Sequence, residues 1–403
     1  MFENKPLFSF SKSSTAIALV FSLSACGGGG SDPAPTTPTT PTTPTTPTTP
    51  TTPTTPMVDI VAEFSTYLTD LADSHIIPSY GAMQLESEQL SLGSEQFCAL
   101  SSPSAIDLQT LQQQWTAFNN TWQTVQWVKV GAVVENNRLF RIQFWPDNNN
   151  AVSRGVEGLL IEQQVVNADL VANQNVGGQG IPALEYLLFP EQTSASLLSA
   201  ANKEKRCEVV MAISQNLQNI ATEINTAWQS SGGNYRAQLI NGTGDFSSIT
   251  DAVEELVTNW LEQLEIVKDE KSLFLLGDSA PGNSALAEHR LSEQSLQSIA
   301  LNLQSFKTLY SNGTGKGFDN ILSDGLGQAE IEQKMSTAID NAIARMAQIN
   351  QDFASYVLLL NSEAGRAELN SLIDELRIIR DVLSSGFVQA LDINIGFNSN
   401  DGD

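Results

Sequence analysis

Apolar residues recur at spacings of three and four along most of the chain from residue 57 onward, which is the periodicity of amphipathic helices. The predicted helices of the first half open near Ile60, near Ser104 and at residue 202. The first of them carries on to Tyr80, and Pro78 is expected to kink it or restart it because proline cannot donate a backbone hydrogen bond.

The same spacing returns in the second half, after a stretch rich in Gly, Ser and Asn over residues 230–244. Four helices are predicted there, over residues 249–267, 291–310, 331–346 and 369–383. Helices joined by short links favour antiparallel packing. The pattern therefore predicts an all-α protein with negligible sheet, built as two tandem bundles resembling four-helix bundles, one over residues 57–232 and one over 245–403.

One segment departs from the helical period. Between Phe140 and Asp147 the apolar residues alternate with polar ones and end in Trp-Pro-Asp, and three asparagines follow. Two interpretations of this segment remain open. Either Arg141, Trp145 and Asp147 line a functional site, or Trp145 is a core residue and Asp147 caps a helix that begins near Ala151.

The first 56 residues cannot belong to a packed core. Lys5 and Lys12 precede a short apolar stretch that ends in Leu-Ser-Ala-Cys, which is typical of an export signal over residues 1–25 and resembles a lipobox at Cys26. Lipid attachment at Cys26 is expected, with a plain secretory signal as the alternative. Residues 26–56 repeat Thr-Thr-Pro, a composition that favours an extended, solvated tether.

The chain is strongly acidic. Residues 1–25 contain Lys5, Lys12 and Glu3, so the remainder carries 18 basic and 44 acidic residues and a net charge of −26. Such a surface disfavours nucleic acid and anionic headgroups and favours cations and basic partners. Solubility of an exported protein explains the same acidity.

Two cysteines remain once Cys26 is assigned to the lipid. An even pair in an oxidising compartment is more typical of a disulfide than of a metal or catalytic site. We therefore predict a bridge between Cys98 and Cys207.

The segment GGQGIPALEYLLFP, residues 177–190, is the most informative stretch of the chain. Its glycines supply a flexible loop, and Pro182 suits the first turn of a helix. Apolar side chains cover almost every side of so short a helix, so Glu185 is expected to be buried. A buried carboxylate needs a cation, hydrogen-bond donors or a proton.

This segment resembles the signature of the imelysin-like family, Gly-x-His-x-x-Glu followed by Tyr-Leu-Leu-Phe. Gly180 and Glu185 match it, whereas Pro182 stands in the place of the histidine. The run ending in Trp-Pro-Asp, residues 288–296 and the terminal Phe-Asn-x-x-Asp-Gly-Asp resemble other family segments. The resemblance implies a helical envelope protein that serves iron uptake. The resemblance of the export signal to a lipobox implies the lipid anchor, and Gly27 after Cys26 favours the outer membrane by analogy with other lipoproteins.

The family-like segments also imply a ligand site between the bundles. Its predicted residues are Glu185, Trp145, Asp147, Arg141, Glu288, Arg290 and Ser292. Residues 288–296 are expected to open a helix that places Glu288, Ser292 and Ser295 on one face and turns His289 away. Glu185 is then either a metal ligand or a carboxylate held by Arg290 and Ser292.

For cofactors, the sequence leaves open whether a divalent metal or iron is bound weakly or not at all. Proline offers no side-chain donor at position 182, and the pair His289 and Glu293, four residues apart, is either a cation site or a solvated pair. The enzyme alternative, a metallopeptidase, requires a motif such as His-Glu-x-x-His, which the sequence lacks.

Three function classes remain. The leading one is a membrane-tethered module that binds a small ligand or an iron species. The second is the metallopeptidase, and the third is a structural protein that docks another envelope component.

Overall fold

The first helical run of the chain is nearly continuous, with one widened turn ahead of its proline. In the computed structural model, which describes residues 58–396, α1 (Ile60–Leu71) leads through the π-helix η1 (Ala72–Ile76) into α2 (Ile77–Ala99). Pro78 lies in the first turn of α2. Because proline cannot donate to the carbonyl four residues earlier and its ring crowds that carbonyl, the turn before it is widened. The predicted restart at Pro78 is confirmed.

The remaining elements are all helical, and no strand occurs among residues 58–396. The first half continues with α3 (Ala105–Val125), η2 (Gly131–Val133), η3 (Glu135–Asn137), α4 (Arg138–Ile142), α5 (Ala151–Leu160), α6 (Ala168–Ala172), η4 (Val176–Gly178), α7 (Gly180–Leu188), η5 (Thr193–Ala195), α8 (Lys203–Trp228) and α9 (Tyr235–Asn241). The second half contains α10 (Ile249–Glu265), η6 (Ile266–Leu273), α11 (Phe274–Leu276), η7 (Ser284–Leu286), α12 (Ser295–Ser311), α13 (Phe318–Asn320), η8 (Ile321–Gly325), α14 (Ala329–Asp352), α15 (Tyr356–Asn361), α16 (Glu363–Val382), η9 (Leu383–Phe387) and α17 (Val388–Leu391).

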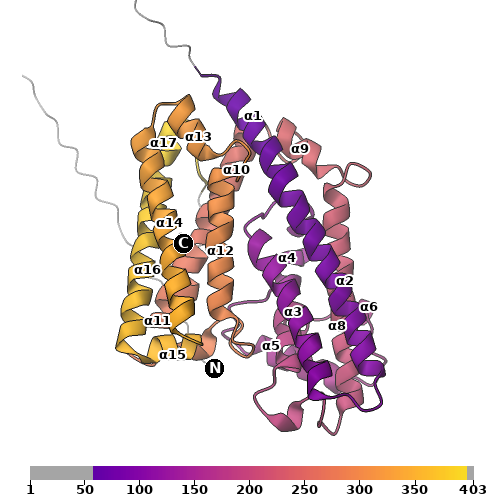
Figure 1. Ribbon diagram of the computed structural model, residues 1–403. Helices are drawn as coiled ribbons and strands as arrows, with labels where there is room; N and C mark the ends of the chain where they lie inside the picture. Colours follow the sequence, from indigo (N-terminus) through magenta and orange to yellow (C-terminus); the bar gives the residue numbers. More distant parts are fainter. Residues whose placement is uncertain (1–57, 397–403) are drawn as a thin grey trace, which may run out of the picture. The chain divides into compact units, whose positions relative to one another are not determined.

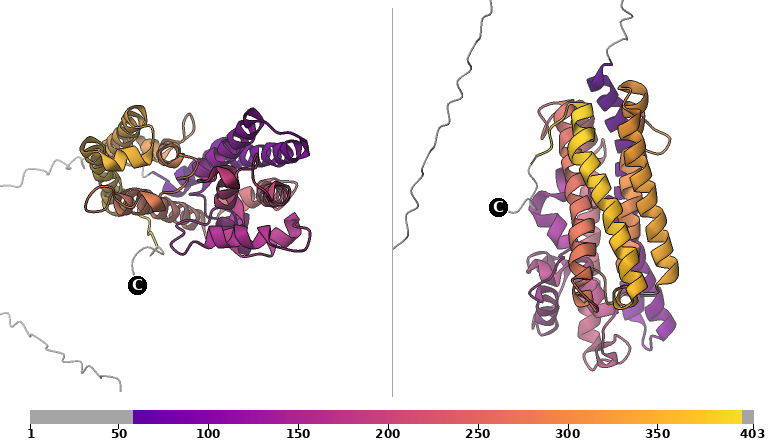
Figure 2. Two further views of the ribbon diagram at one scale, coloured as in Figure 1. Left: turned by 90° about the horizontal axis from the view of Figure 1, so that it is seen from below. Right: turned by 90° about the vertical axis from the view of Figure 1, so that its left-hand side faces the viewer.

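The helices gather into two neighbouring groups (Figure 1). In the first group α2 packs against α3 and α8, and α7 packs against both α3 and α8. In the second, α14 packs against α12 and α16, and α10 against α16. The two groups meet where α12 lies on α3 and α1 lies on α10. The end-on view in Figure 2 shows the two groups side by side. The all-helical prediction is confirmed.

The predicted boundary between the bundles contains a short helix. Residues 230–244 include α9, which lies against α1, α8 and α10. The described residues cluster as one compact unit, so the two groups share a continuous core. The bundle limits 57–232 and 245–403 stay a prediction. Cys26, the tether over residues 26–56 and residues 397–403 lie outside the described part of the chain.

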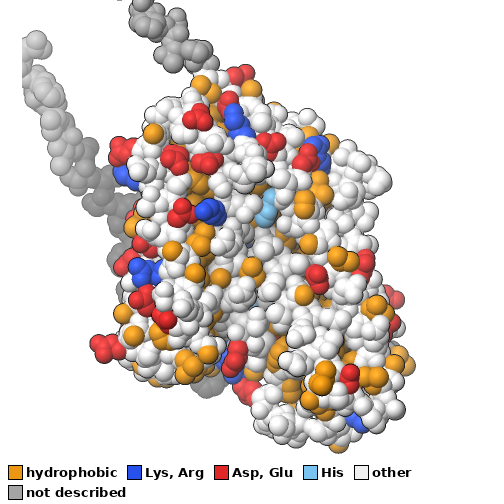
Figure 3. Space-filling view, in the orientation of Figure 1, with side chains coloured by type: hydrophobic (Ala, Val, Ile, Leu, Met, Phe, Trp, Pro, Cys, Tyr) orange, Lys and Arg blue, Asp and Glu red, His pale blue; other side chains and the backbone are white. Residues whose placement is uncertain are grey.

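Acidic side chains are scattered over the face seen in Figure 3, several of them beside Lys or Arg. No helix within residues 58–396 combines the length and the apolar character that crossing a membrane requires.

A buried polar cluster joins the two groups of helices. The ammonium of Lys271, 2% exposed, lies 2.7 Å from a carboxylate oxygen of Glu288, which is 3% exposed. Lys271 also donates to Asn302 at 2.9 Å and to Gln123 at 3.1 Å. Burial lowers the pKa of Lys271. Burial alone would raise the pKa of Glu288, but the charge of Lys271 brings it below its ordinary value.

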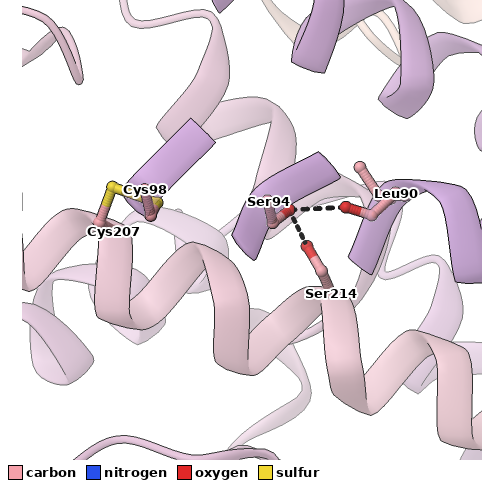
Figure 4. The surroundings of a disulfide bond; sticks show 5 residues. All are labelled: Leu90, Ser94, Cys98, Cys207 and Ser214. Atoms are coloured by element: carbon pink, nitrogen blue, oxygen red, sulfur yellow. Dashed lines mark hydrogen bonds between the residues drawn. A yellow bond between two sulfur atoms is a disulfide. The ribbon is translucent and has the colours of Figure 1, made fainter. Parts of the chain in front are cut away.

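The predicted disulfide is present. Cys98, near the end of α2, is bonded to Cys207, in the first turns of α8, across 109 residues of sequence (Figure 4). Deeper along the same helix pair, Ser94 donates to the carbonyl of Leu90 at 2.8 Å and lies 2.9 Å from the hydroxyl of Ser214. The bridge therefore closes one end of the α2–α8 interface.

Loss of the disulfide should destabilise the protein. Replacing Cys98 and Cys207 together by Ser should lower the free energy of unfolding by about 2–5 kcal/mol, because the unfolded chain regains the freedom of a long closed loop. Urea denaturation of the oxidised wild type and the variant measures the difference. Equal midpoints and slopes would contradict the expectation, and two free thiols in the native protein would contradict the bridge itself.

Removing one partner of the buried ion pair should lower the stability of the protein more than removing both charges. We expect Lys271→Met to lower the free energy of unfolding by about 3–5 kcal/mol, because it leaves the Glu288 carboxylate buried without its cation. The double variant Lys271→Met/Glu288→Gln should recover part of that loss. Lys307→Met, which breaks an exposed pair with Asp340, is the matched control and should change stability by less than about 1 kcal/mol. A double variant less stable than Lys271→Met would contradict this.

Candidate functional site

Helix α7 begins in a tight approach to the end of α4. Gly180, its first residue, has φ +76°, and a Cβ there would lie 2.3 Å from the carbonyl oxygen of Ile142. Only glycine satisfies both the left-handed conformation and this contact. Gly180 therefore fixes the direction in which α7 presents Glu185.

Glu185 is buried, as expected, and is held by hydrogen-bond donors. It is 6% exposed, and its Oε1 accepts from the backbone N–H of Ser292 at 2.9 Å and from the Ser292 hydroxyl at 2.7 Å. Arg290, the other expected donor, instead pairs with Glu191 at 2.6 Å. The predicted contact with Ser292 is thus confirmed, and it joins α7 to the segment before α12.

The predicted helix over residues 288–296 is wrong in its first seven residues. Residues 288–293 form turns, and α12 begins at Ser295. His289 and Glu293 have φ +53° and +59°, values outside the right-handed helix. The physical reason is tertiary: Glu288 is drawn to Lys271 and Ser292 to Glu185, on different elements. A straight helix could not satisfy both contacts.

His289 does not turn away from the site. It is 3% exposed, stacks edge-on against Trp115 at 5.4 Å, and places Nδ1 3.8 Å from Oε2 of Glu185. The amide nitrogens of Gln123 and Gln143 lie 3.3 and 3.4 Å from its Nε2. Since the oxygen of Gln123 accepts from Lys271, its amide group faces the imidazole as a donor. Nε2 then accepts, and Nδ1 faces Oε2 of Glu185 without a hydrogen-bond partner in the described part of the chain. Because His289 is buried and Glu293 is exposed, the alternative of a solvated pair is wrong, and the cation site shared with Glu293 stays a prediction.

A cavity of about 530 Å³ opens beside Glu185, between the first group of helices and residues 285–291. Of the predicted site residues, it brings together Glu185, Trp145, Asp147 and Arg290, and Pro182 also lies in its wall. Trp145 is half-buried and donates to the carbonyl of Leu286 at 3.1 Å. The structure thus gathers side chains from segments more than 140 residues apart.

Asp147 has both of the roles that the sequence left open for it, in the site and as a helix cap. It lines the cavity, and its carboxylate also accepts from the backbone N–H groups of Ala151 at 2.7 Å and Val152 at 2.9 Å. These are free donors of the first turn of α5. Asp147 therefore caps α5 from the cavity wall.

Arg141, Glu288 and Ser292 are not part of the cavity wall but support it. Arg141 donates to Gln179 and to Asn216, each at 3.1 Å, and burial lowers the pKa of its guanidinium. Gln179 directly precedes Gly180, so Arg141 steadies the start of α7. Glu288 accepts from Gln143 at 3.1 Å and anchors the following turns through Lys271.

Several polar residues around Glu185 were not predicted from the sequence. His289 was assigned to the wrong face, and Arg206, which lines the cavity from α8, was not considered. A signal for Arg206 existed, since it lies on the same helical face as Val210, Ile213 and Leu217, where an apolar residue is expected. Lys271 and Gln123 carried no comparable signal.

The donor set does not fit a metal ion held by protein side chains. Pro182 supplies no ligand, Oε1 of Glu185 is taken by Ser292, and only Oε2 and the nearby Nδ1 of His289 converge. A catalytic zinc site takes three protein ligands. Within residues 58–396, no group of three or more His, Cys, Asp or Glu side chains is placed to hold a metal ion.

Comparison with solved structures places the fold among known helical proteins. An imelysin-like protein from Psychrobacter arcticum 273-4 is similar with a TM-score of 0.70 and 22% identity, over 85% of this chain and 99% of that one. A protein described as an iron-regulated protein A precursor, from Parabacteroides distasonis ATCC 8503, is similar with a TM-score of 0.66 and 14% identity, over 84% of this chain and 97% of that one. At these identities the likeness concerns the fold.

Sequence comparison identifies the family. No curated protein sequence matches the chain. The profile of the Imelysin family, Peptidase M75, matches residues 76–383, which is more than half of the chain and includes Glu185 and residues 288–296. The chain therefore belongs to the imelysin family.

Proposed function

We propose that this protein is a ligand-binding module of the bacterial cell envelope, anchored through Cys26 on its Thr/Pro-rich tether, that serves iron uptake by capturing a small ligand beside Glu185. The observation that carries the proposal is the cavity itself. Its volume of about 530 Å³ lies in the range of small-molecule sites, and its wall combines aromatic side chains with a few polar groups. Iron uptake is supported by the family resemblance and by the similar fold of a protein described as iron-regulated.

The preferred ligand is a small molecule and not a bare metal ion. One oxygen of the Glu185 carboxylate already accepts two hydrogen bonds from Ser292. These donors stabilise the buried charge, so Glu185 does not need a cation beside it. Trp145 and Phe144 offer aromatic surface in the cavity wall, and Tyr186 and Arg290 offer polar groups in the same wall. Such a wall suits an organic body with a few oriented polar atoms.

Filling the cavity should abolish function without harming the fold. Ala285 lines the cavity but is exposed, so Ala285→Trp occupies the space without overpacking the core. In cells that lack the native protein, we expect this variant to lose support of growth when iron is limiting. The matched control is Ala344→Trp, at an exposed position of α14 away from the cavity, which should support growth like the wild type.

Either of two results would overturn the proposal. One is full growth of the Ala285→Trp cells under iron limitation. The other is growth of cells that lack the protein entirely at the wild-type rate in the same medium. Immunoblotting of both variants ensures that growth is compared at equal protein levels.

Restoring a donor at position 182 should create metal affinity. Pro182 and Glu185 lie one turn apart in the same cavity wall, so Pro182→His adds a third donor near Glu185 and His289. Isothermal titration with Zn²⁺ and with Fe²⁺ under anaerobic conditions should show at least about tenfold tighter binding than in the wild type. Tight stoichiometric binding by the unmodified protein would show that the donors are assigned wrongly.

A further inference from the structure

Arg206 forms part of the cavity wall although its charge has no partner. The residue is only 7% exposed. Its Nε donates to the side chain of Asn202 at 3.1 Å, and its Nη1 is buried with no acceptor among residues 58–396. Across the same described residues, no carboxylate forms an ion pair with it. A guanidinium keeps its proton at physiological pH, so it cannot escape the burial by becoming neutral.

The acids of the cavity are, by contrast, already engaged. Asp147 caps α5, Glu185 accepts from Ser292, Glu191 pairs with Arg290, and Glu157 accepts from the hydroxyl of Tyr186 at 2.9 Å. A buried charge without a partner is costly, and unsatisfied buried donors are rare in folded proteins. Arg206 therefore lacks an anion, and no acid of the wall or of the rest of residues 58–396 forms an ion pair with it.

We propose that Arg206 is the recognition residue for a ligand carboxylate, and that the ligand of this cavity is a small organic acid with a single carboxylate on an apolar body. Guanidinium groups bind carboxylates through paired, charge-assisted hydrogen bonds. Phe144, Trp145, Leu286 and Leu291 supply apolar surface for the body of the ligand. Four carboxylates in the same wall disfavour a ligand of higher negative charge. This inference rests on the proposed function, because it names the class of ligand for the same cavity.

A matched pair of probes isolates the carboxylate. Benzoate and benzamide have nearly the same shape, and only benzoate carries the charge. Isothermal titration or ligand-observed NMR of the wild type should show benzoate binding at least about tenfold tighter than benzamide, as expected for a hydrogen bond to a charged group. Inorganic phosphate should bind more weakly than benzoate.

The Arg206→Gln variant should lower benzoate affinity about tenfold and leave benzamide affinity unchanged. The matched control is Arg154→Gln, which removes the same charge from an exposed position of α5 outside the cavity wall and should change neither. Arg206→Lys keeps the positive charge but loses the paired N–H donors of the guanidinium group, so it should bind benzoate with intermediate affinity. It also replaces Arg206→Gln in the comparison if thermal unfolding shows that the neutral variant does not fold.

The outcomes separate this inference from the proposed function. If Ala285→Trp blocks benzoate but Arg206→Gln does not weaken it, Arg206 is not the anion site, while the cavity remains a ligand site. Equal binding of benzoate and benzamide, no binding of either, or Arg206-dependent phosphate binding as tight as that of benzoate each overturns the ligand class. If benzoate binding depends on Arg206 but Ala285→Trp cells grow normally under iron limitation, the inference stands and the role in iron uptake fails.

Discussion

Two buried carboxylates hold together the region between the two groups of helices. Glu185 leaves α7 to accept two hydrogen bonds from Ser292, and Glu288 leaves the turns before α12 to meet Lys271 in the core. Glu185 accepts from a residue of the second half of the chain, whereas Glu288 pairs with Lys271 of its own half and accepts from Gln143 of the first half. The position of residues 285–291, and with it one wall of the cavity, depends on both contacts.

The backbone of those turns is strained in a way that only such contacts explain. His289 and Glu293 are not glycines, yet both have positive φ, at a cost on the order of 1 kcal/mol or more each. The left-handed conformation at His289 turns its imidazole inward, where Gln123, Gln143 and Trp115 surround it. The buried polar contacts thus stabilise the strained backbone of these turns, and the strained backbone in turn places the side chains that make those contacts.

The contrast between helices and turns explains what could be predicted from the sequence. Apolar spacing located α3, α8, α14 and α16 well, because each buries a stripe that repeats every three or four residues. Glu288, Ser292 and Ser295 have the same three-and-four spacing as such a stripe. The backbone conformation before Ser295 is nevertheless decided by contacts with distant elements. For Arg206 the sequence does give a signal, a charged residue on the apolar stripe of α8, but only the structure shows that no acid within the described residues pairs with it.

The disulfide lies at the end of α2, but it also stabilises part of the cavity wall. Cys207 directly follows Arg206 in the opening turns of α8, and helix ends are where backbone hydrogen bonds fray first. The covalent link to α2 suppresses that fraying. Without the bridge, the first turns of α8 would be the part of this wall that opens most readily. The disulfide holds that part closed.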